Sequence, residues 1–160
     1  MLLDTEVVAL DESGRADFEL LQQRMHPTRP SAEELARVPV TLVVFDLLRH
    51  RGEDLTRAPY ERRRDALLEL GLHEHAGVHV PPAFTGISGE QMLAAVDAQG
   101  LEGVVAKRLD SRYEPGRRSR AWIKTPIRHT SSVAVIGWTP STSSRYHLSS
   151  LQLAVPDKAG

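Results

Sequence analysis

The chain has 160 residues, 41% of them hydrophobic and none of them cysteine, which suits one domain or one domain plus the start of a second, and excludes disulfide frameworks and thiolate metal sites. No apolar run approaches the ~20 residues that cross a bilayer, and the N-terminus lacks a signal-peptide pattern, so we expect a cytoplasmic protein without a membrane partner. The net charge is −1, but residues 102–128 carry eight basic and three acidic side chains, which suits the phosphates of a nucleotide or nucleic acid, or else an ordinary solvated surface.

The first part of the chain predicts one strand and two short helices. Leu2–Leu10 is expected to form a strand because it is rich in aliphatic and β-branched residues. A helix is predicted over Phe18–Arg24, ahead of a proline. Ser31 and Glu34 have the spacing of a capping box, which predicts the start of a second helix that runs to Val38.

A buried strand and a longer helix follow. Val40–Asp46 is a nearly continuous apolar run, typical of a strand that is buried on both faces. Arg49–Asp54 is expected to be a polar loop, and Pro59–Leu70 an amphipathic helix that Gly71 ends. The side chains expected to face the core are Leu67, Leu68 and Leu70, and those expected in solvent are Arg62, Arg63 and Arg64.

The second half mixes strands with one more helix. A short strand is predicted over Val78–Val80, and a helix from Ser88 to Gln99. The further expected strands are Gly103–Lys107, Ala121–Thr125, Ser131–Trp138 and Leu151–Val155. Because strands and helices do not alternate with a strict βαβ period, the pattern favours an α+β fold with largely antiparallel sheets.

Four segments place charged or aromatic side chains beside apolar strands. They are Leu3–Val8 with two carboxylates on one strand face, Val43–Leu48 with Phe45 and Asp46 at its end, Leu101–Arg108, and Ala121–Thr125 with Trp122 and Lys124 on one face. Each segment alone is an ordinary strand end or solvent-exposed strand face. Their order along the chain is far more specific.

In this order the segments resemble the motifs of covalent nucleotidyltransferases, above all the bacterial ATP-dependent DNA ligases of the non-homologous end-joining type. Leu3–Val8 resembles the family's "DGEVV" strand, with Thr5 in place of the glycine. Phe45–Leu48 resembles its "FDLL" element. Glu102–Arg108 is similar to its "EGVVAK" strand, the most specific match, and Trp122–Lys124 resembles its "WIK" strand.

The resemblance covers about residues 2–140 and implies a domain organisation. Residues 1–128 would form part of an ATP-grasp-like adenylation domain, α+β with mainly antiparallel sheets, and residues 129–160 the start of an OB-fold β-barrel. The implied function is ATP-dependent sealing of nicked or broken double-stranded DNA, through lysyl-AMP and DNA-adenylate intermediates, in DNA repair and recombination. The implied location is the cytoplasm, in association with the nucleoid.

The resemblance also implies roles for individual side chains. Lys107 and Lys124 would contact the α-phosphate of ATP, and Phe45 would stack on its adenine. Glu102 would hold Mg²⁺ or Mn²⁺, and Glu6 would contact the metal or the ribose. Cations around the phosphorus would stabilise the charged transition state of each phosphoryl transfer. The side chains that would help to hold the DNA backbone are Arg117, Arg118 and Arg120.

The sequence departs from the family pattern in three places. The family's "KxDG" segment, with its nucleophilic lysine, precedes the "DGE" strand, but only three residues do so here and no lysine occurs before Lys107. Pro126 stands where many members have a second lysine after "WIK". Residues 131–160 supply about two of the five strands of an OB-fold. We therefore expect a chain that is truncated at both ends and inactive alone, with a companion chain able to carry the missing segment.

Two other functions remain open. The chain could be a non-catalytic remnant that binds nucleotide or nucleic acid, or a fragment of an RNA ligase or capping-type nucleotidyltransferase. His73-Glu74-His75 followed by His79 hints at metal ligands, but the spacing differs from H-E-x-x-H, and a polar loop is the simpler interpretation.

Overall fold

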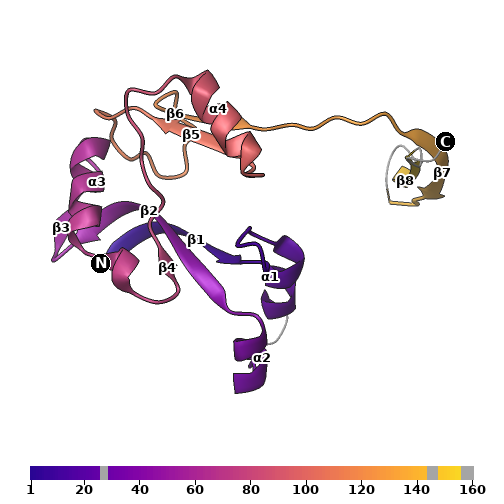
Figure 1. Ribbon diagram of the computed structural model, residues 1–160, viewed down its shortest axis with the longest axis horizontal. Helices are drawn as coiled ribbons and strands as arrows, with labels where there is room; N and C mark the ends of the chain where they lie inside the picture. The colour runs from indigo at the N-terminus through magenta and orange to yellow at the C-terminus, as the bar shows by residue number, and fades with distance from the viewer. Residues whose placement is uncertain (26–28, 144–147, 156–160) are drawn as a thin grey trace. The chain divides into compact units, whose positions relative to one another are not determined.

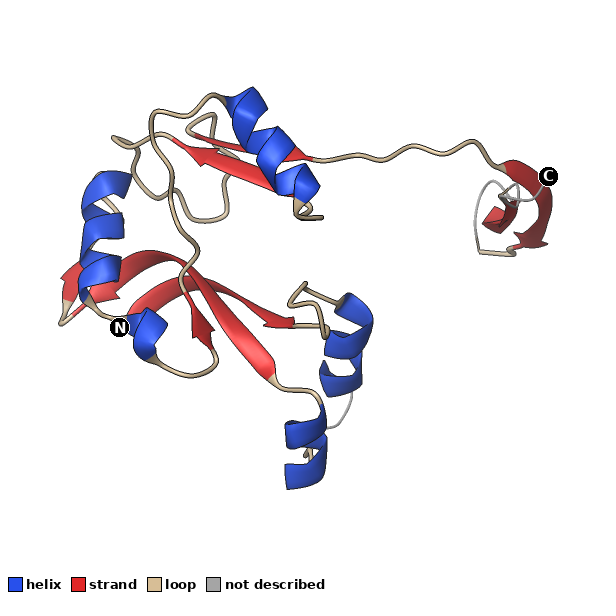
Figure 2. Ribbon diagram, viewed as in Figure 1, coloured by secondary structure: helices blue, strands red, loops and turns tan. Residues whose placement is uncertain are grey.

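The computed structural model describes residues 1–25, 29–143 and 148–155, which form an α+β fold of short helices and mainly antiparallel sheets (Figures 1 and 2). The chain divides into two compact units, Met1–Ile127 and Arg128–Gly160. Within the described ranges, no helix combines the length and the apolar character that a bilayer crossing requires.

The first unit contains a four-stranded sheet in which β2, Val40–His50, is the central strand. β1, Leu2–Ala9, confirms the strand predicted for this segment and runs antiparallel to β2. The short β4, Val78–His79, pairs parallel to β2, and β3, Glu53–Asp54, pairs antiparallel with its end. β2 therefore brings together residues that are far apart in the sequence.

The polar loop predicted over Arg49–Asp54 is wrong, because β2 runs on to His50 and β3 begins at Glu53. The two residues between these strands, Arg51 and Gly52, have φ values of 48° and 87°. Positive φ at both central positions is the signature of the two-residue turn that matches the twist of a β-hairpin. The segment therefore closes a hairpin in spite of its polar composition.

Helix α3, Tyr60–Glu69, forms where a helix was predicted but presents a different face to the core. Leu67 is buried as expected, whereas Arg63 and Arg64 are also buried and Leu68 is 46% exposed. The prediction that these two arginines face solvent is therefore wrong. Their guanidinium groups find buried acceptors on other elements, which a helical pattern cannot reveal.

The apolar core of this unit lies between the four-stranded sheet and α3. Its fully buried members are Val44 and Leu47 from β2, Leu67 from α3, and Leu55 from the loop between β3 and α3. Partly buried aliphatic side chains surround them, namely Leu3, Leu42, Ala66, Leu70, Leu72, Val78 and Val80. The core fixes α3 against β2, next to the segment that carries Phe45 and Asp46.

The remaining helices are α1, Phe18–Met25, α2, Ala32–Arg37, the single 3₁₀ turn η1, Leu72–Glu74, and α4, Gly89–Ala98. The Ser31 hydroxyl accepts a hydrogen bond from the main-chain N–H of Glu34, which confirms the capping box. Ser88 caps α4 in the same way. Gly71 follows α3 with a φ of 61°, as expected of a residue that ends a helix.

Two further sheets are antiparallel pairs. β5, Gly103–Lys107, pairs with β6, Trp122–Pro126, and α4 lies against β5 (Figure 1). In the second unit, β7, Ala134–Pro140, pairs with β8, Leu148–Ala154. All four strands overlap the segments predicted for them.

Candidate functional site

The β5–β6 pair places both motif lysines on one face of a sheet. Lys107 lies opposite Trp122, and Val105 lies opposite Lys124. Directly opposed residues of an antiparallel pair share a face, and side chains two positions apart on one strand do so too. Lys107, Trp122 and Lys124 therefore project from the same side.

Gly103 explains why glycine occupies the second position of the Glu102–Arg108 segment. Its φ of 149° is one that side-chain-bearing residues rarely adopt, and a Cβ there would collide with the Thr125 carbonyl oxygen on β6. Glycine therefore allows the two backbones to approach closely where β5 begins. This approach sets the register that brings Lys107 opposite Trp122.

Lys107 ends β5 with its ammonium group among aromatic rings. Its Nζ lies 3.9 Å from the ring centre of Trp122, 4.8 Å from that of Tyr60 and 5.9 Å from that of Phe45. It also donates a long hydrogen bond, 3.4 Å, to the Phe45 carbonyl oxygen. These three rings, here called the aromatic cage, offer the cation their π faces rather than a counter-ion.

The backbone of β2 is irregular where it meets this lysine. Asp4 pairs with Asp46, but the next residue of β1, Thr5, pairs with Val44, so Phe45 is the extra residue of a bulge. A bulge leaves its extra residue outside the regular ladder and redirects its side chain. The irregularity therefore coincides with the position at which Lys107 contacts the Phe45 carbonyl and ring.

Asp46 and Arg63 form a fully buried ion pair next to the cage. The Arg63 Nε donates to Asp46 Oδ1 at 2.9 Å, and Nη2 donates to Oδ2 at 2.8 Å, while both side chains are completely shielded from solvent. The third guanidinium nitrogen donates to the carbonyls of Ala58 and Ser111. A buried pair of this kind depends on hydrogen bonds to its remaining donors, and these two carbonyls accept them here.

Ser111 connects this ion pair to the segment between β5 and β6, residues 108–121, here called the basic loop. The Ser111 hydroxyl donates to the Arg108 carbonyl at 2.6 Å and accepts from the Trp122 indole N–H at 3.3 Å. Tyr113, from the same loop, meets Trp122 edge to face, with ring centres 5.5 Å apart. The loop is therefore anchored to α3 and to the ring of Trp122.

Burial changes the protonation behaviour of the cage. It lowers the pKa of the Lys107 ammonium below its ordinary value, and the nearby Asp46 and Asp4 carboxylates partly offset this effect. Burial also raises the pKa values of Tyr60 and Tyr113, in the latter with help from Asp4. Lys107 is thus a partly desolvated cation, a kind of group often found at functional sites.

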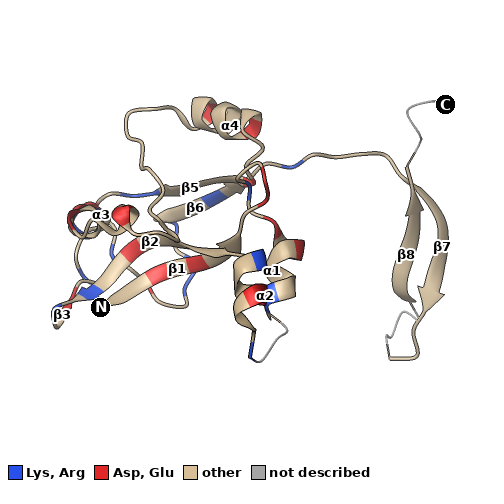
Figure 3. Cartoon of the chain, turned by 60° about the horizontal axis from the view of Figure 1, so that its bottom comes forward, with Lys and Arg blue, Asp and Glu red and all other residues tan. Residues whose placement is uncertain are grey.

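The predicted site residues are only partly brought together. Phe45 and Lys107, 62 residues apart, are in contact, and Lys124 shares the face of Lys107 but is exposed. Glu6, on β1, and Glu102, just before β5, are exposed and make no side-chain hydrogen bond within the described part of the chain. Figure 3 shows the acidic positions on β1 and β2 and the basic position on β6.

The described residues do not form a preassembled set of ligands for a divalent cation. Across residues 1–25, 29–143 and 148–155, no group of three or more His, Cys, Asp or Glu side chains could hold a metal ion. Mg²⁺, however, usually takes one or two carboxylates and completes its shell with water and substrate phosphates. The exposed carboxylates of Glu6 and Glu102 fit that chemistry. Among the described residues, the histidine-rich segment around His73 gives no group of three or more such ligands.

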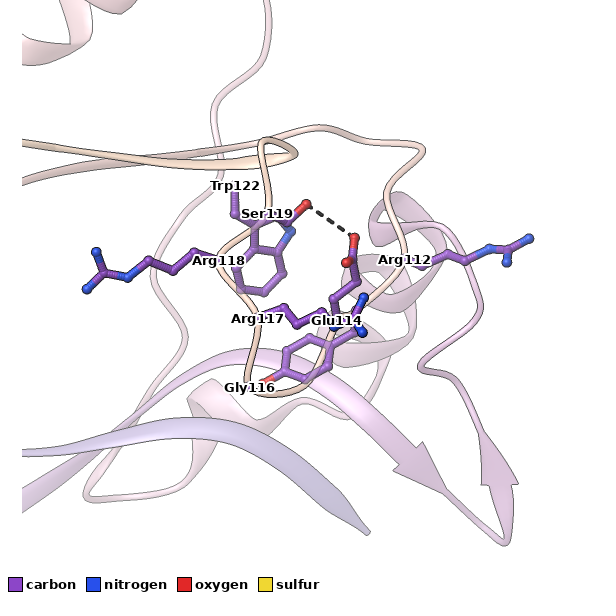
Figure 4. Close-up of a pocket in the computed structure, with 8 residues that line it drawn as sticks. Arg112, Glu114, Gly116, Arg117, Arg118, Ser119 and Trp122 are labelled. Atoms are coloured by element: carbon purple, nitrogen blue, oxygen red, sulfur yellow. Dashed lines mark hydrogen bonds between the residues drawn. The ribbon is translucent and has the colours of Figure 1, made fainter.

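Residues of the basic loop, together with Trp122, line a pocket of about 240 Å³ (Figure 4). Inside it, the Ser119 hydroxyl donates to the Glu114 carboxylate at 3.2 Å. The Arg118 guanidinium points away from the pocket. The three arginines predicted to hold DNA, Arg117, Arg118 and Arg120, are all exposed.

Four residues that organise the cage were not predicted from the sequence, namely Tyr60, Arg63, Ser111 and Tyr113. They lie on α3 and the basic loop, outside the motif segments. The signal that was available is Asp46 itself, because a carboxylate at the end of a buried strand requires a cationic or hydrogen-bonding partner. The sequence does not show which cation that is.

The sequence model of the family described as "ATP dependent DNA ligase domain" matches residues 1–125. The multifunctional non-homologous end joining protein LigD of Mycolicibacterium smegmatis is 38% identical over 161 residues, which cover 100% of this chain and 19% of that protein. DNA ligase C of Mycobacterium tuberculosis is 31% identical over 167 residues, covering 99% of this chain and 45% of that protein.

Two solved structures of DNA ligases also match this chain. A mycobacterial DNA ligase D complexed with ATP and MES matches with a TM-score of 0.66 and 34% identity, over 99% of this chain and 46% of that one. The ligase domain of LigD from M. tuberculosis matches with a TM-score of 0.64 and 35% identity, over 99% of this chain and 47% of that one. The chain thus spans less than half of these ligase chains and about a fifth of the LigD proteins.

Proposed function

This chain belongs to the ATP-dependent DNA ligase family, and from that premise we propose that it supplies ATP-contacting side chains of a ligase that seals nicked or broken double-stranded DNA in end joining. Lys107 and Lys124 contact the α-phosphate, and Phe45 stacks on the adenine. The observation that carries the proposal is the contact between Lys107 and Phe45, which joins two motifs 62 residues apart in one partly buried site. The relative complexed with ATP supports the choice of nucleotide.

The charge of the site suits this role. Lys107 is a partly desolvated cation held by rings and a neutral carbonyl, so a phosphate can approach without displacing a counter-ion. Lys124, exposed on the same face, adds a second cation. Glu102 and Glu6 would hold Mg²⁺, which neutralises phosphate charge when it is bound. Arg117, Arg118 and Arg120 would contact the DNA backbone.

We further propose that residues 1–128 are a portion of the adenylation domain and residues 129–160 a portion of an OB-fold. The family's first step needs a lysine that attacks the α-phosphate in line. The 160 residues contain only three lysines, Lys107, Lys124 and Lys158, and none precedes β1. The contacts that hold Lys107 in the cage support a role in contacting the phosphate rather than in attacking it.

One set of samples tests the proposal. ATP binding with Mg²⁺, measured by calorimetry, is expected to weaken at least about tenfold in Lys107→Ala and in Lys124→Ala, about 1.4 kcal/mol each. Lys158→Ala, which removes the lysine outside the motifs, is the matched control and should bind like the parent. In the same samples, ATP labelled at its α-phosphate should leave no label on the denatured chain. Equal affinities for Lys107→Ala and Lys158→Ala would refute the phosphate contact, and a labelled band would show that a residue of this chain can attack the α-phosphate.

A further inference from the structure

Among the described residues, Lys107 has no ion-pair partner, although two carboxylates lie near enough to affect its pKa. Asp46 and Asp4 both favour the charged form of the lysine. In the part of the chain that the structure describes, however, no carboxylate oxygen lies within 4.0 Å of Lys107 Nζ. Another group must therefore prevent Asp46 and Asp4 from forming an ion pair with the Lys107 ammonium.

Arg63 is the group that engages Asp46. Its fork-shaped guanidinium occupies both carboxylate oxygens, at 2.9 and 2.8 Å, and Oδ1 also accepts the main-chain N–H of Leu47. The carbonyls of Ala58 and Ser111 hold the other end of the guanidinium. Planar bidentate pairing fixes the orientation of both partners, which a single ammonium could not do.

We propose that Arg63 is a positioning residue for Lys107: by occupying both oxygens of Asp46, it keeps the Lys107 ammonium unpaired inside the aromatic cage and available to a phosphate. The inference rests on the proposed contact between Lys107 and the α-phosphate of ATP. Without Arg63, the Asp46 carboxylate would pair with Lys107 and compete with the phosphate for the same cation.

The other charges around Lys107 do not provide this control. Asp4, on β1, interacts with Tyr113 from the basic loop. Arg64, on α3, donates to the Pro81 carbonyl instead of to a carboxylate. Tyr60 faces Lys107 with its ring. Arg63 alone engages the acid whose backbone neighbour, Phe45, already accepts a hydrogen bond from Lys107.

The test is a rescue experiment in the full 160-residue chain. Trp138→Phe serves as the parent, because Trp122 is then the only tryptophan and reports on the ammonium 3.9 Å from its ring. Three variants are compared with it, namely Arg63→Met, the double variant Arg63→Met with Asp46→Asn, and Lys107→Met. The asparagine keeps an acceptor for the Leu47 N–H but carries no charge.

ATP binding gives the first readout. Arg63→Met should bind ATP about tenfold more weakly than the parent, because Asp46 now pairs with Lys107. The double variant should recover to within about threefold of the parent, because the competing carboxylate is gone. If Arg63 were merely structural, or touched the phosphate itself, the double variant would stay as weak as the single one, and that result would overturn the inference.

A pH titration of Trp122 emission gives a second readout that needs no ATP. The step that Lys107→Met abolishes belongs to Lys107. Its midpoint should rise in Arg63→Met, since an unpaired Asp46 stabilises the ammonium, and should return to near the parent value in the double variant. A shared midpoint in the two Arg63 variants would overturn the inference.

The two readouts separate this inference from the proposed function. Parent protein that fails to bind ATP, or binds it independently of Lys107, refutes the phosphate contact, while the titration still decides the role of Arg63. If Arg63→Met does not fold by circular dichroism, Arg63→Lys replaces it, because a point-charge donor leaves one Asp46 oxygen free. A midpoint above the parent value then supports the inference, and an unchanged midpoint contradicts it.

Discussion

The β1–β2 region and the β7–β8 hairpin are built from similar apolar strands but bury them very differently. In β2, Val44 and Leu47 are completely shielded, with Leu67 of α3 packed against them. In β7, Val135, Ile136 and Trp138 remain 58%, 68% and 66% exposed. An apolar strand pattern is therefore enough for pairing, but burial needs an element that covers the sheet, and an isolated two-stranded hairpin is marginal by itself.

The comparison extends to charge. The covered sheet tolerates a carboxylate with no solvent contact, Asp46, because α3 supplies Arg63 as its partner. A lone buried charge costs several kcal/mol, so this tolerance depends on the covering helix. The same helix thus provides both the apolar cover and the counter-ion, and single substitutions can separate these two contributions.

The largest effect is expected from breaking the buried pair. Asp46→Ala leaves the Arg63 guanidinium buried without its partner, and should lower the free energy of unfolding by about 3–5 kcal/mol. Urea denaturation followed by circular dichroism measures the loss. The matched control is Glu53→Ala, which breaks the exposed pair with Arg62 and should cost less than about 1 kcal/mol. Similar losses for the two variants would show that burial does not govern this pair.

An intermediate effect is expected from truncating a leucine in the covered region. Leu67→Ala removes a fully buried side chain between α3 and β2, and should lower the free energy of unfolding by about 2–5 kcal/mol. Leu151→Ala truncates a half-exposed side chain on β8 and should change the free energy of unfolding by less than about 0.5 kcal/mol. The same urea titration compares them. A loss at Leu151 as large as that at Leu67 would mean that a covering surface protects the hairpin in solution.

The smallest effect on stability is expected at an exposed apolar side chain of β7. Ile136→Ser should change the free energy of unfolding by less than about 0.5 kcal/mol, but should reduce self-association, because exposed apolar strands invite pairing with other chains. Sedimentation velocity over a range of concentrations measures this. The control is Thr139→Ser, which changes an exposed polar residue on the same strand. Unchanged association in Ile136→Ser would contradict the prediction.

Local signals in the sequence predicted much of the fold. The serines that cap α2 and α4 and the glycine after α3 all depend on neighbours within four residues. The hairpin at Arg51 and Gly52 was missed because the polar composition of the segment concealed its turn conformation. The buried face of α3 was misjudged because the partner that draws Arg63 inward lies 17 residues away.

The site was predicted less completely than the fold. The family motifs indicated Phe45 and Lys107, and the structure joins them. Tyr60 and Tyr113 could not be identified, since they become part of the site only when α3 and the basic loop pack around Trp122. The predicted roles of all the site residues, Phe45 and Lys107 included, depend on ligands and remain predictions.

The hydrogen bonds of the Arg63 guanidinium lead us to expect an order of assembly during folding. Its hydrogen bonds reach back 17 residues to Asp46 and forward 48 residues to the Ser111 carbonyl. The pairing of β5 with β6 begins between Lys107 and Trp122, which are far closer in sequence than Arg63 and Ser111 are. Contacts between near neighbours close faster than distant ones, so β5–β6 can form before it docks. An arginine is buried at tolerable cost only when all its partners are in place. Docking of the basic loop onto α3 should therefore be all-or-none, and the Leu47 and Ser111 amides should gain protection from hydrogen exchange together.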